Sequence, residues 1–211
     1  MYRILILFAL SCSLHVTPAA ADSYDDLLAA VKINDIAAAE ALFAKGMDVN
    51  TTDPGANTML MLSIQNDYEE MAGLLLRRKA QVDARNQYGE TALMMAAANG
   101  NLNLAKLLLD HGAKVNLTGW SPLIYAAWRG QREMVKYLLG SGAEIDAVSP
   151  GGISALMMAV RGGHAGTVKL LLWEVADPTI RSDSGATAMA WALKTGNDEI
   201  VSLLKQAGAK E

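Results

Sequence analysis

The stretch that decides the fold runs from Asn86 to Asn116 and reads NQYGETALMMAAANGNLNLAKLLLDHGAKVN. Thr91 stands directly before an apolar segment, where its hydroxyl can cap the N-terminus of a helix. Gly100 and Gly112 each follow a helical pattern, and glycine is favoured just past the end of a helix. The stretch therefore predicts two short helices joined by a tight turn and followed by an extended loop.

Two markers of this stretch recur along the chain in the same phase. A hydroxyl residue heads the first helix of each unit, and an alanine follows the second helix. The hydroxyl residues are Thr58, Thr91, Ser121, Ser154 and Thr187, and the alanines are Ala80, Ala113, Ala143, Ala176 and Ala209. Both series step by 33, 30, 33 and 33 residues. Two markers in phase indicate an internal repeat, and a period of about 33 residues is typical of stacked helical units.

The repeated unit resembles the ankyrin repeat, because residues 89–97 closely match its signature G-x-T-P-L-H-x-A-A. The resemblance covers nearly all of residues 22–211. It implies an all-α repeat solenoid of helix–turn–helix units with hairpin-like loop fingers. The units expected are an N-terminal cap at 22–52, repeats at about 53–85, 86–116, 117–148 and 149–181, and a C-terminal unit at 182–211. In the cap, helices are expected at about Tyr24–Lys32 and Asp35–Lys45.

The chain departs from the family pattern at the motif histidine, which normally ties the backbones of adjacent repeats. No unit has it. The matching residues are Met61, Met94, Ile124, Met157 and Ala190. We expect apolar packing to replace the histidine bond.

Two further departures concern the loops. Lys79 and Val175 replace the glycine that follows the second helix in other units. A left-handed Val175 would cost about 1–2 kcal/mol relative to glycine. Between repeats two and three, three residues are missing before Ser121, which predicts a truncated finger and a notch in the binding face.

Residues 1–21 read as a secretory signal peptide, expected to be cleaved before Asp22. Arg3 supplies a positive start, Ile4–Leu10 is apolar, and small residues end at Ala21. The apolar run is too short to span a membrane. Cleavage before Cys12, with lipid attached to it, is the alternative and would give a lipid-anchored envelope protein.

The expected mature chain carries no cysteine and a small negative charge. Of 18 basic and 22 acidic side chains, only Arg3 lies in the signal segment, so the mature balance is −5. This charge argues against binding nucleic acid through net charge alone. Export without cysteine favours a bacterial periplasm over a disulfide-rich secretory pathway.

Few residues are arranged for catalysis or for metal binding. Met61, Met94 and Met157 recur in register, and their thioethers could form a ladder for a soft metal. We expect them instead to pack between the first helices of adjacent repeats. His111 and His164 fall at a helix end and in an inter-helix turn, so both are expected to be structural. The sequence therefore predicts no catalytic residue, no metal ligand and no cofactor, with metal or haem handling as the alternative.

The repeat frame predicts where a partner would bind. In ankyrin proteins, partners usually dock on the concave face, which the loop tips and the exposed part of each first helix form. In repeat two this frame selects Gln87, Tyr88, Glu90, Ala98 and Asn99. Across the central repeats it brings together a set rich in interface-favoured residue types. The set consists of Tyr88, Trp120, Trp128, Arg129 and Arg161.

We therefore expect a non-catalytic, monomeric periplasmic protein that binds another protein, one of the envelope or periplasm, through this face. An alternative role for the central tryptophans is packing, in which Trp120 folds over the gap of the truncated finger and Trp128 caps its neighbour. Trp173 and Trp191 are expected to pack, since they fall at a helix end and in the terminal unit.

Overall fold

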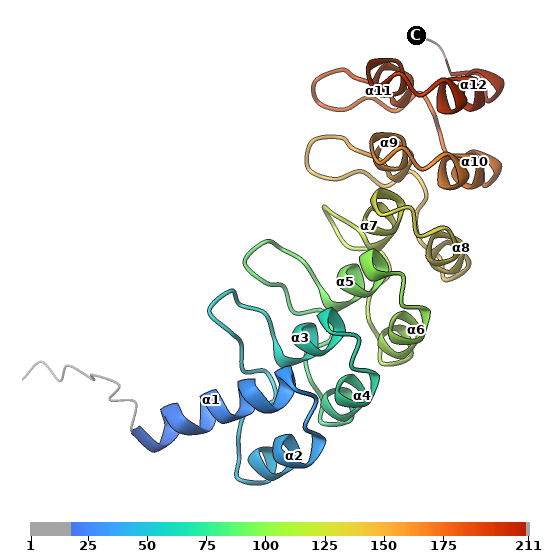
Figure 1. The fold of residues 1–211 in the computed structure, drawn as a ribbon. Coiled ribbons are helices and arrows are strands. Elements are labelled where there is room, and N and C mark those ends of the chain that lie inside the picture. Colours follow the sequence, from blue (N-terminus) through green and yellow to red (C-terminus); the bar gives the residue numbers. More distant parts are fainter. Residues whose placement is uncertain (1–17, 210–211) are drawn as a thin grey trace, which may run out of the picture.

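The computed structural model describes residues 18–209, which form six helix pairs stacked in chain order (Figure 1). The helices are α1 (Pro18–Lys32), α2 (Ile36–Ala44), α3 (Met59–Gln65), α4 (Glu69–Arg77), α5 (Ala92–Asn99), α6 (Leu102–Asp110), α7 (Pro122–Trp128), α8 (Arg132–Gly140), α9 (Ala155–Arg161), α10 (Ala165–Trp173), α11 (Ala188–Thr195) and α12 (Asp198–Gln206). Within the described range, the strand content is limited to two isolated bridges at the bases of fingers. The all-α repeat solenoid predicted from the sequence is confirmed.

The hydroxyl residues that mark the repeats all cap helices, as predicted. Each side-chain oxygen accepts a hydrogen bond from the backbone N–H three residues later, at 3.2–3.4 Å. These residues are buried, so the bond satisfies an N–H group that water could not reach. The caps fix where each of the helices α3, α5, α7, α9 and α11 begins.

The N-terminal pair differs from the prediction at one boundary. Helix α1 begins at Pro18, six residues before the predicted start at Tyr24. Proline is favoured at the first position of a helix, and the alanines that follow it are strong helix formers. Asp22, the predicted first residue of the mature chain, therefore lies inside α1. The remainder of the signal segment, with Cys12, lies outside the described residues.

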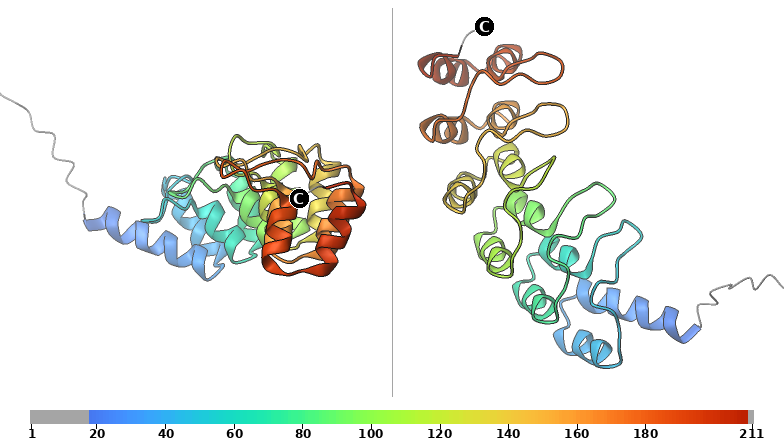
Figure 2. Two further views of the ribbon diagram at one scale, coloured as in Figure 1. Left: turned by 90° about the horizontal axis from the view of Figure 1, so that it is seen from above. Right: turned by 180° about the vertical axis from the view of Figure 1, so that it is seen from behind.

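The stack is curved, and its two faces are made by different elements. The odd-numbered helices and the fingers form the concave side, and the even-numbered helices from α2 to α12 form the convex side (Figure 1). Seen from above, the fingers project along one edge of the stack (Figure 2). Among residues 18–209, no helix combines the length and apolar character needed to cross a bilayer.

The core runs the length of the stack between the two layers of helices. Met61, Met94 and Met157 are at most 1% exposed within it, as is Ile124. Apolar packing thus replaces the motif histidine in four units, as expected, whereas Ala190 in the last unit is exposed. The burial of these sulfur atoms favours the packing interpretation of the methionine series over a metal ladder.

The prediction that Trp173 packs is wrong, since its side chain is 82% exposed. Helix α10 buries Val168 and Leu171. Trp173 lies two residues beyond Leu171, which rotates it by about 200° to the opposite face of the helix. Trp191 does pack against the core, as expected.

Side-chain hydrogen bonds join each repeat to the next along the finger bases. At the start of each of the first four fingers an Asn or Asp follows a valine or isoleucine, and its Oδ1 accepts a hydrogen bond from a backbone N–H of the following repeat at 2.8–3.0 Å. The four bonds join Asn50 to Gln81, Asp83 to Lys114, Asn116 to Glu144 and Asp146 to Asp177. They hold adjacent units in register at the edge where apolar packing ends.

The finger between repeats two and three is truncated, as predicted. In the other four fingers a backbone N–H bonds to the carbonyl four residues later, closing a narrow loop. Within the described residues, the short finger around Thr118 and Gly119 has no such bond. A side-chain bond from Arg85 Nη2 to the Thr118 carbonyl, 3.3 Å long, links it to the preceding finger. The short connection accompanies close packing of α5 on α7, while α6 and α8 are the weakest-packed neighbours of the outer layer.

Val175 adopts the left-handed conformation, with φ of 67°. Its N–H donates to Leu172 O, and the next N–H, of Ala176, donates to Leu171 O. This is the arrangement that normally calls for glycine after a helix. The side chain is 81% exposed, so it gains little packing to offset the strain.

We expect Val175→Gly to stabilise the protein by about 1 kcal/mol, because glycine adopts this conformation without steric cost. Thermal unfolding followed by circular dichroism would measure the change in midpoint. The matched control is Glu174→Gly, one residue earlier at φ −80°, which should lower the midpoint. An unchanged or lower midpoint for Val175→Gly would contradict the expectation.

Candidate partner-binding site

One pocket of about 360 Å³ opens on the concave side at the centre of the stack. It spans three repeats, from the second finger across α7 to α9. Its walls are mainly aromatic, with two charged side chains. The lining residues are Tyr88, Glu90, Trp120, Ile124, Tyr125, Trp128, Met158 and Arg161. Its size falls in the range of sites that hold a small molecule or one large side chain.

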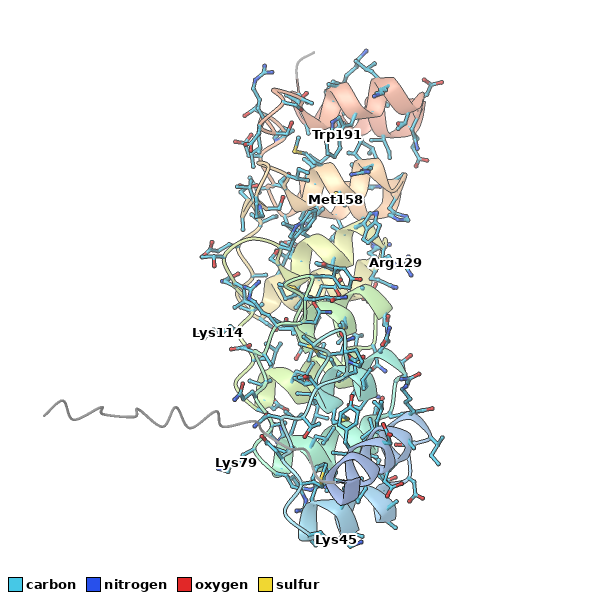
Figure 3. The ribbon with its side chains drawn as sticks, turned by 90° about the vertical axis from the view of Figure 1, so that its left-hand side faces the viewer. Lys45, Lys79, Lys114, Arg129, Met158 and Trp191 are labelled. Atoms are coloured by element: carbon cyan, nitrogen blue, oxygen red, sulfur yellow. The ribbon has the colours of Figure 1, made fainter. Side chains whose placement is uncertain are left out.

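Four of the five predicted binding residues line this pocket. Tyr88 is 72% exposed and Trp128 43% exposed, while Trp120 is half-buried. The fifth, Arg129, does not line the pocket, but its guanidinium carbon lies 5.8 Å from the centroid of the Trp128 ring. In the view onto the concave face, Arg129 lies at one edge and Met158 nearer the middle (Figure 3).

Tyr125 lies at the centre of the cluster and was missed by the sequence interpretation. Its ring makes edge contacts with Trp120 and Trp128, at centroid distances of 6.1 and 6.5 Å. The repeat frame could have identified Tyr125 from its position in the unit. The fifth residue of each unit, counted from the hydroxyl cap, lies on the concave side of the first helix. These residues are Leu62, Met95, Tyr125, Met158 and Trp191.

Hydrogen bonds hold the polar side of the pocket in place. Glu90 Oε1 accepts from the Tyr125 hydroxyl at 3.0 Å, and Glu90 Oε2 accepts from Asn86 Nδ2 at 2.9 Å. Asn86 Nδ2 also donates to Asn57 Oδ1 in the first finger, at 2.9 Å. A single chain of bonds therefore connects two fingers to helix α7, and it fixes the orientation of the Glu90 carboxylate.

Burial raises the pKa of the Tyr125 hydroxyl above its ordinary value of 10.0, and the charge and hydrogen bond of Glu90 raise it further. The hydroxyl therefore stays protonated, and acts as a donor, to a more alkaline pH than an ordinary tyrosine does. The bond to the Glu90 carboxylate is retained over the same range.

The observed position of Trp120 agrees in part with packing and in part with a place in the predicted binding set. Its ring is half-buried against the core and against Tyr125, which agrees with the packing role. The same ring also lines the pocket. Packing and pocket formation are compatible here, because one side of the indole can be buried while the other faces the opening.

A second recess of about 420 Å³ lies on the far side of the short finger. It is lined by the truncated loop, including Thr118 and Gly119, and by the base of the next finger at Glu144 and Val148. It lies at the truncated finger but shares no lining residue with the concave pocket, so a notch in the binding face itself stays a prediction. Its walls are mostly small or backbone groups, so it offers shape but few anchoring side chains.

The two histidines have structural roles, as expected. His111 Nδ1 lies 2.9 Å from Leu107 O, within its own helix α6. His164 Nε2 lies 2.9 Å from Trp128 O, which ties the turn before α10 to the end of α7. Among the described residues, no three His, Cys, Asp or Glu side chains gather in a geometry that could hold a metal ion.

Comparison with known proteins identifies the repeat. A family model described as "Ankyrin repeats (3 copies)" matches residues 27–118, 60–149 and 123–211. An ankyrin repeat domain from Acinetobacter baumannii AYE has a similar solved structure, with a TM-score of 0.76, 30% identity, and coverage of 87% of this chain and 98% of that one.

Curated relatives match over shorter stretches. Protein phosphatase 1 regulatory subunit 27 of Mus musculus is 35% identical over 91 residues, which are 42% of this chain and 59% of that protein. A putative ankyrin repeat protein of Rickettsia bellii is 30% identical over 122 residues, which are 54% of this chain and 35% of that protein. The matches thus cover less than two thirds of either relative.

The fold defines a curved solenoid of stacked helix pairs, and the chain belongs to the ankyrin-repeat family. Ankyrin repeats are a general protein–protein interaction module and are typically non-catalytic.

Because burial and Glu90 raise the pKa of Tyr125, we predict that the protein loses stability more steeply at alkaline pH than a variant without this hydroxyl. Above about pH 10 the unfolded chain releases the Tyr125 proton while the folded protein retains it, so the free energy of unfolding falls as pH rises. We expect Tyr125→Phe to lower the thermal midpoint at neutral pH but to flatten its decline between about pH 9 and pH 11. Tyr137→Phe, on helix α8, is the control. Equal slopes for wild type and Tyr125→Phe would contradict this assignment.

Proposed function

We propose that this protein is a non-catalytic binding module that grips a partner protein through its concave face, with the aromatic pocket as the central anchor. The observation that carries the proposal is the convergence of Tyr88, Trp120, Trp128 and Arg161 on one opening. Trp, Tyr and Arg are the residue types most enriched in interface hot spots. The mouse relative is named a regulatory subunit of a phosphatase, which supports a role in binding another protein.

The partly exposed rings supply the physical basis of binding. Tyr88 and Trp128 hold large apolar surfaces in water, and covering such surfaces on binding is favourable. The Tyr125 contacts and the Glu90 bonds restrain the pocket before any partner arrives. A preorganised site loses little conformational entropy on binding, which favours affinity.

The alternative of metal or haem handling receives less support. The recurring methionines are buried in the core. A soft-metal ladder would require their sulfur atoms to leave these apolar contacts. Binding a partner protein requires no such rearrangement.

We further propose that the protein is exported to a bacterial periplasm, where it acts as a monomer on an envelope or periplasmic protein. The proposal rests on the signal-like residues 1–21 and the absence of cysteine after Cys12. We expect the intact mass of the exported protein to correspond to a chain beginning at Asp22. A mass corresponding to diacylglyceryl-Cys12 at the N-terminus would support the lipid-anchored alternative. The full-length mass would contradict export by either route.

The central test is a pull-down from periplasmic extract with the exported protein. We expect Trp120→Ala/Trp128→Ala to lose at least about tenfold of the captured partner, because two hot-spot side chains are removed. Trp173→Ala is the matched control, since it removes an exposed tryptophan from the convex side and should leave capture unchanged. Circular dichroism would check that the double variant folds. A partner retained by the double variant, or lost with Trp173→Ala, would move the site away from the concave pocket.

A further inference from the structure

The Glu90 carboxylate lies in the aromatic pocket without a cationic partner. Its two oxygens accept one hydrogen bond each, from the Tyr125 hydroxyl and from Asn86 Nδ2. Among the described residues, no Lys or Arg forms an ion pair with it. A carboxylate oxygen can accept more than one hydrogen bond, so both retain acceptor capacity. The pocket thus contains a fixed negative charge that its own chain does not neutralise.

Four aromatic side chains line the same pocket as this carboxylate. Tyr88, Trp120, Tyr125 and Trp128 all line the same opening. The face of an aromatic ring attracts a cation through its quadrupole, and tryptophan does so most strongly. Trp128 already has one cation near its ring, the guanidinium of Arg129, at 5.8 Å. Ring faces and a carboxylate attract the same kind of ligand.

The other charged residue of the pocket, Arg161, is turned toward the next repeat. Its guanidinium carbon lies 6.0 Å from the centroid of the Trp191 ring, which belongs to the last unit. Arg161 and Trp191 also line a separate recess there. Arg161 thus contacts Trp191 as well as lining the pocket, and among the described residues it forms no ion pair with Glu90.

We propose that this pocket receives a basic side chain of the partner protein, a lysine or an arginine, with its aliphatic stem against the rings and its charge near Glu90. The proposal rests on the proposed function and names the chemistry of its central contact. A purely apolar side chain would bury the Glu90 carboxylate without a counter-ion, which is unfavourable. An acidic side chain would add a like charge beside it. A basic side chain satisfies both the rings and the carboxylate.

Three blocked amino acids can test the charge preference directly. Nα-acetyl-lysine methylamide carries the ammonium, Nα-acetyl-norleucine methylamide has a similar stem without it, and Nα-acetyl-glutamate methylamide carries the opposite charge. Each would be titrated into the ¹⁵N-labelled exported protein while the indole N–H signals of Trp120 and Trp128 are followed by NMR. The Trp173 signal, from the convex side, is the internal control.

We expect the lysine amide to shift the Trp120 and Trp128 signals saturably, with a Kd on the order of 10 mM for so small a probe. The norleucine amide should bind at least about fivefold more weakly, because it lacks the charge that the rings and Glu90 attract. The glutamate amide should give no saturable shift. Equal binding of the lysine and norleucine amides, preference for glutamate, or no saturable shift up to about 100 mM of lysine amide would each overturn the proposal.

Two variants that change the charge of the pocket in opposite directions extend the test. Glu90→Gln should weaken binding of the lysine amide about fivefold or more, and Arg161→Gln should strengthen it, because this change removes a like charge from the pocket lining. Glu133→Gln, on the convex helix α8, is the matched control for removing one carboxylate. Because Glu90→Gln could loosen the second finger, the Arg161 variant provides a readout that disturbs no finger bond. Weaker or unchanged binding in Arg161→Gln, or unchanged binding in a folded Glu90→Gln, would contradict the charge assignment.

The same variants separate this inference from the proposed function. A partner lost with Trp120→Ala/Trp128→Ala but retained by Glu90→Gln would leave concave-face binding intact and refute the basic contact. A partner retained by the tryptophan variant would instead refute the concave site itself.

Discussion

Each helix pair of this protein has an apolar side that only the neighbouring pair can cover. Leu93 and Met94 of one unit, for example, are at most 1% exposed because the adjacent first helices close over them. The stack therefore gains stability through nearest-neighbour contacts, as expected for a linear repeat array. The hydroxyl caps and the Asn and Asp hydrogen bonds at the finger bases support this packing, since they satisfy polar backbone groups at the edges of the apolar layer.

The central pocket lies where the repeat pattern is interrupted. Repeat three lacks three residues, so its finger cannot close in the manner of the other four. Trp120 is half-buried against the core there, and Tyr125 contacts its ring from helix α7. The outer helices α6 and α8 separate at the same junction, while α5 and α7 stay closely packed. A shortened loop thus accompanies both the local bending of the stack and the opening lined by aromatic rings.

Polar contacts give this pocket a defined shape. The bonds from Asn57 through Asn86 and Glu90 to Tyr125 connect two fingers to a helix. Loops of this kind are usually the most mobile parts of a repeat protein. Anchoring the second finger to α7 limits that motion beside the aromatic pocket. The raised pKa of Tyr125 keeps its hydroxyl as a donor to a more alkaline pH than an ordinary tyrosine would allow, so the anchoring bond persists above pH 10.

The sequence by itself determined the features that depend on local chemistry and on period. The five helix caps, the burial of Met61, Met94 and Met157 and the short finger could all be predicted, because each follows from residue type at a fixed place in the repeat. For Val175 the sequence left two outcomes open, a left-handed residue or an altered loop, and the structure shows the first. The same frame placed Tyr88, Trp120, Trp128 and Arg161 on one face. Tertiary structure alone decided how these side chains meet. The Glu90–Tyr125 bond joins residues 35 apart, and the exposure of Trp173 depends on which face of α10 its neighbours cover. The repeat period determines where a residue lies on the solenoid, whereas its side-chain contacts and its exposure depend on the packed geometry of neighbouring repeats.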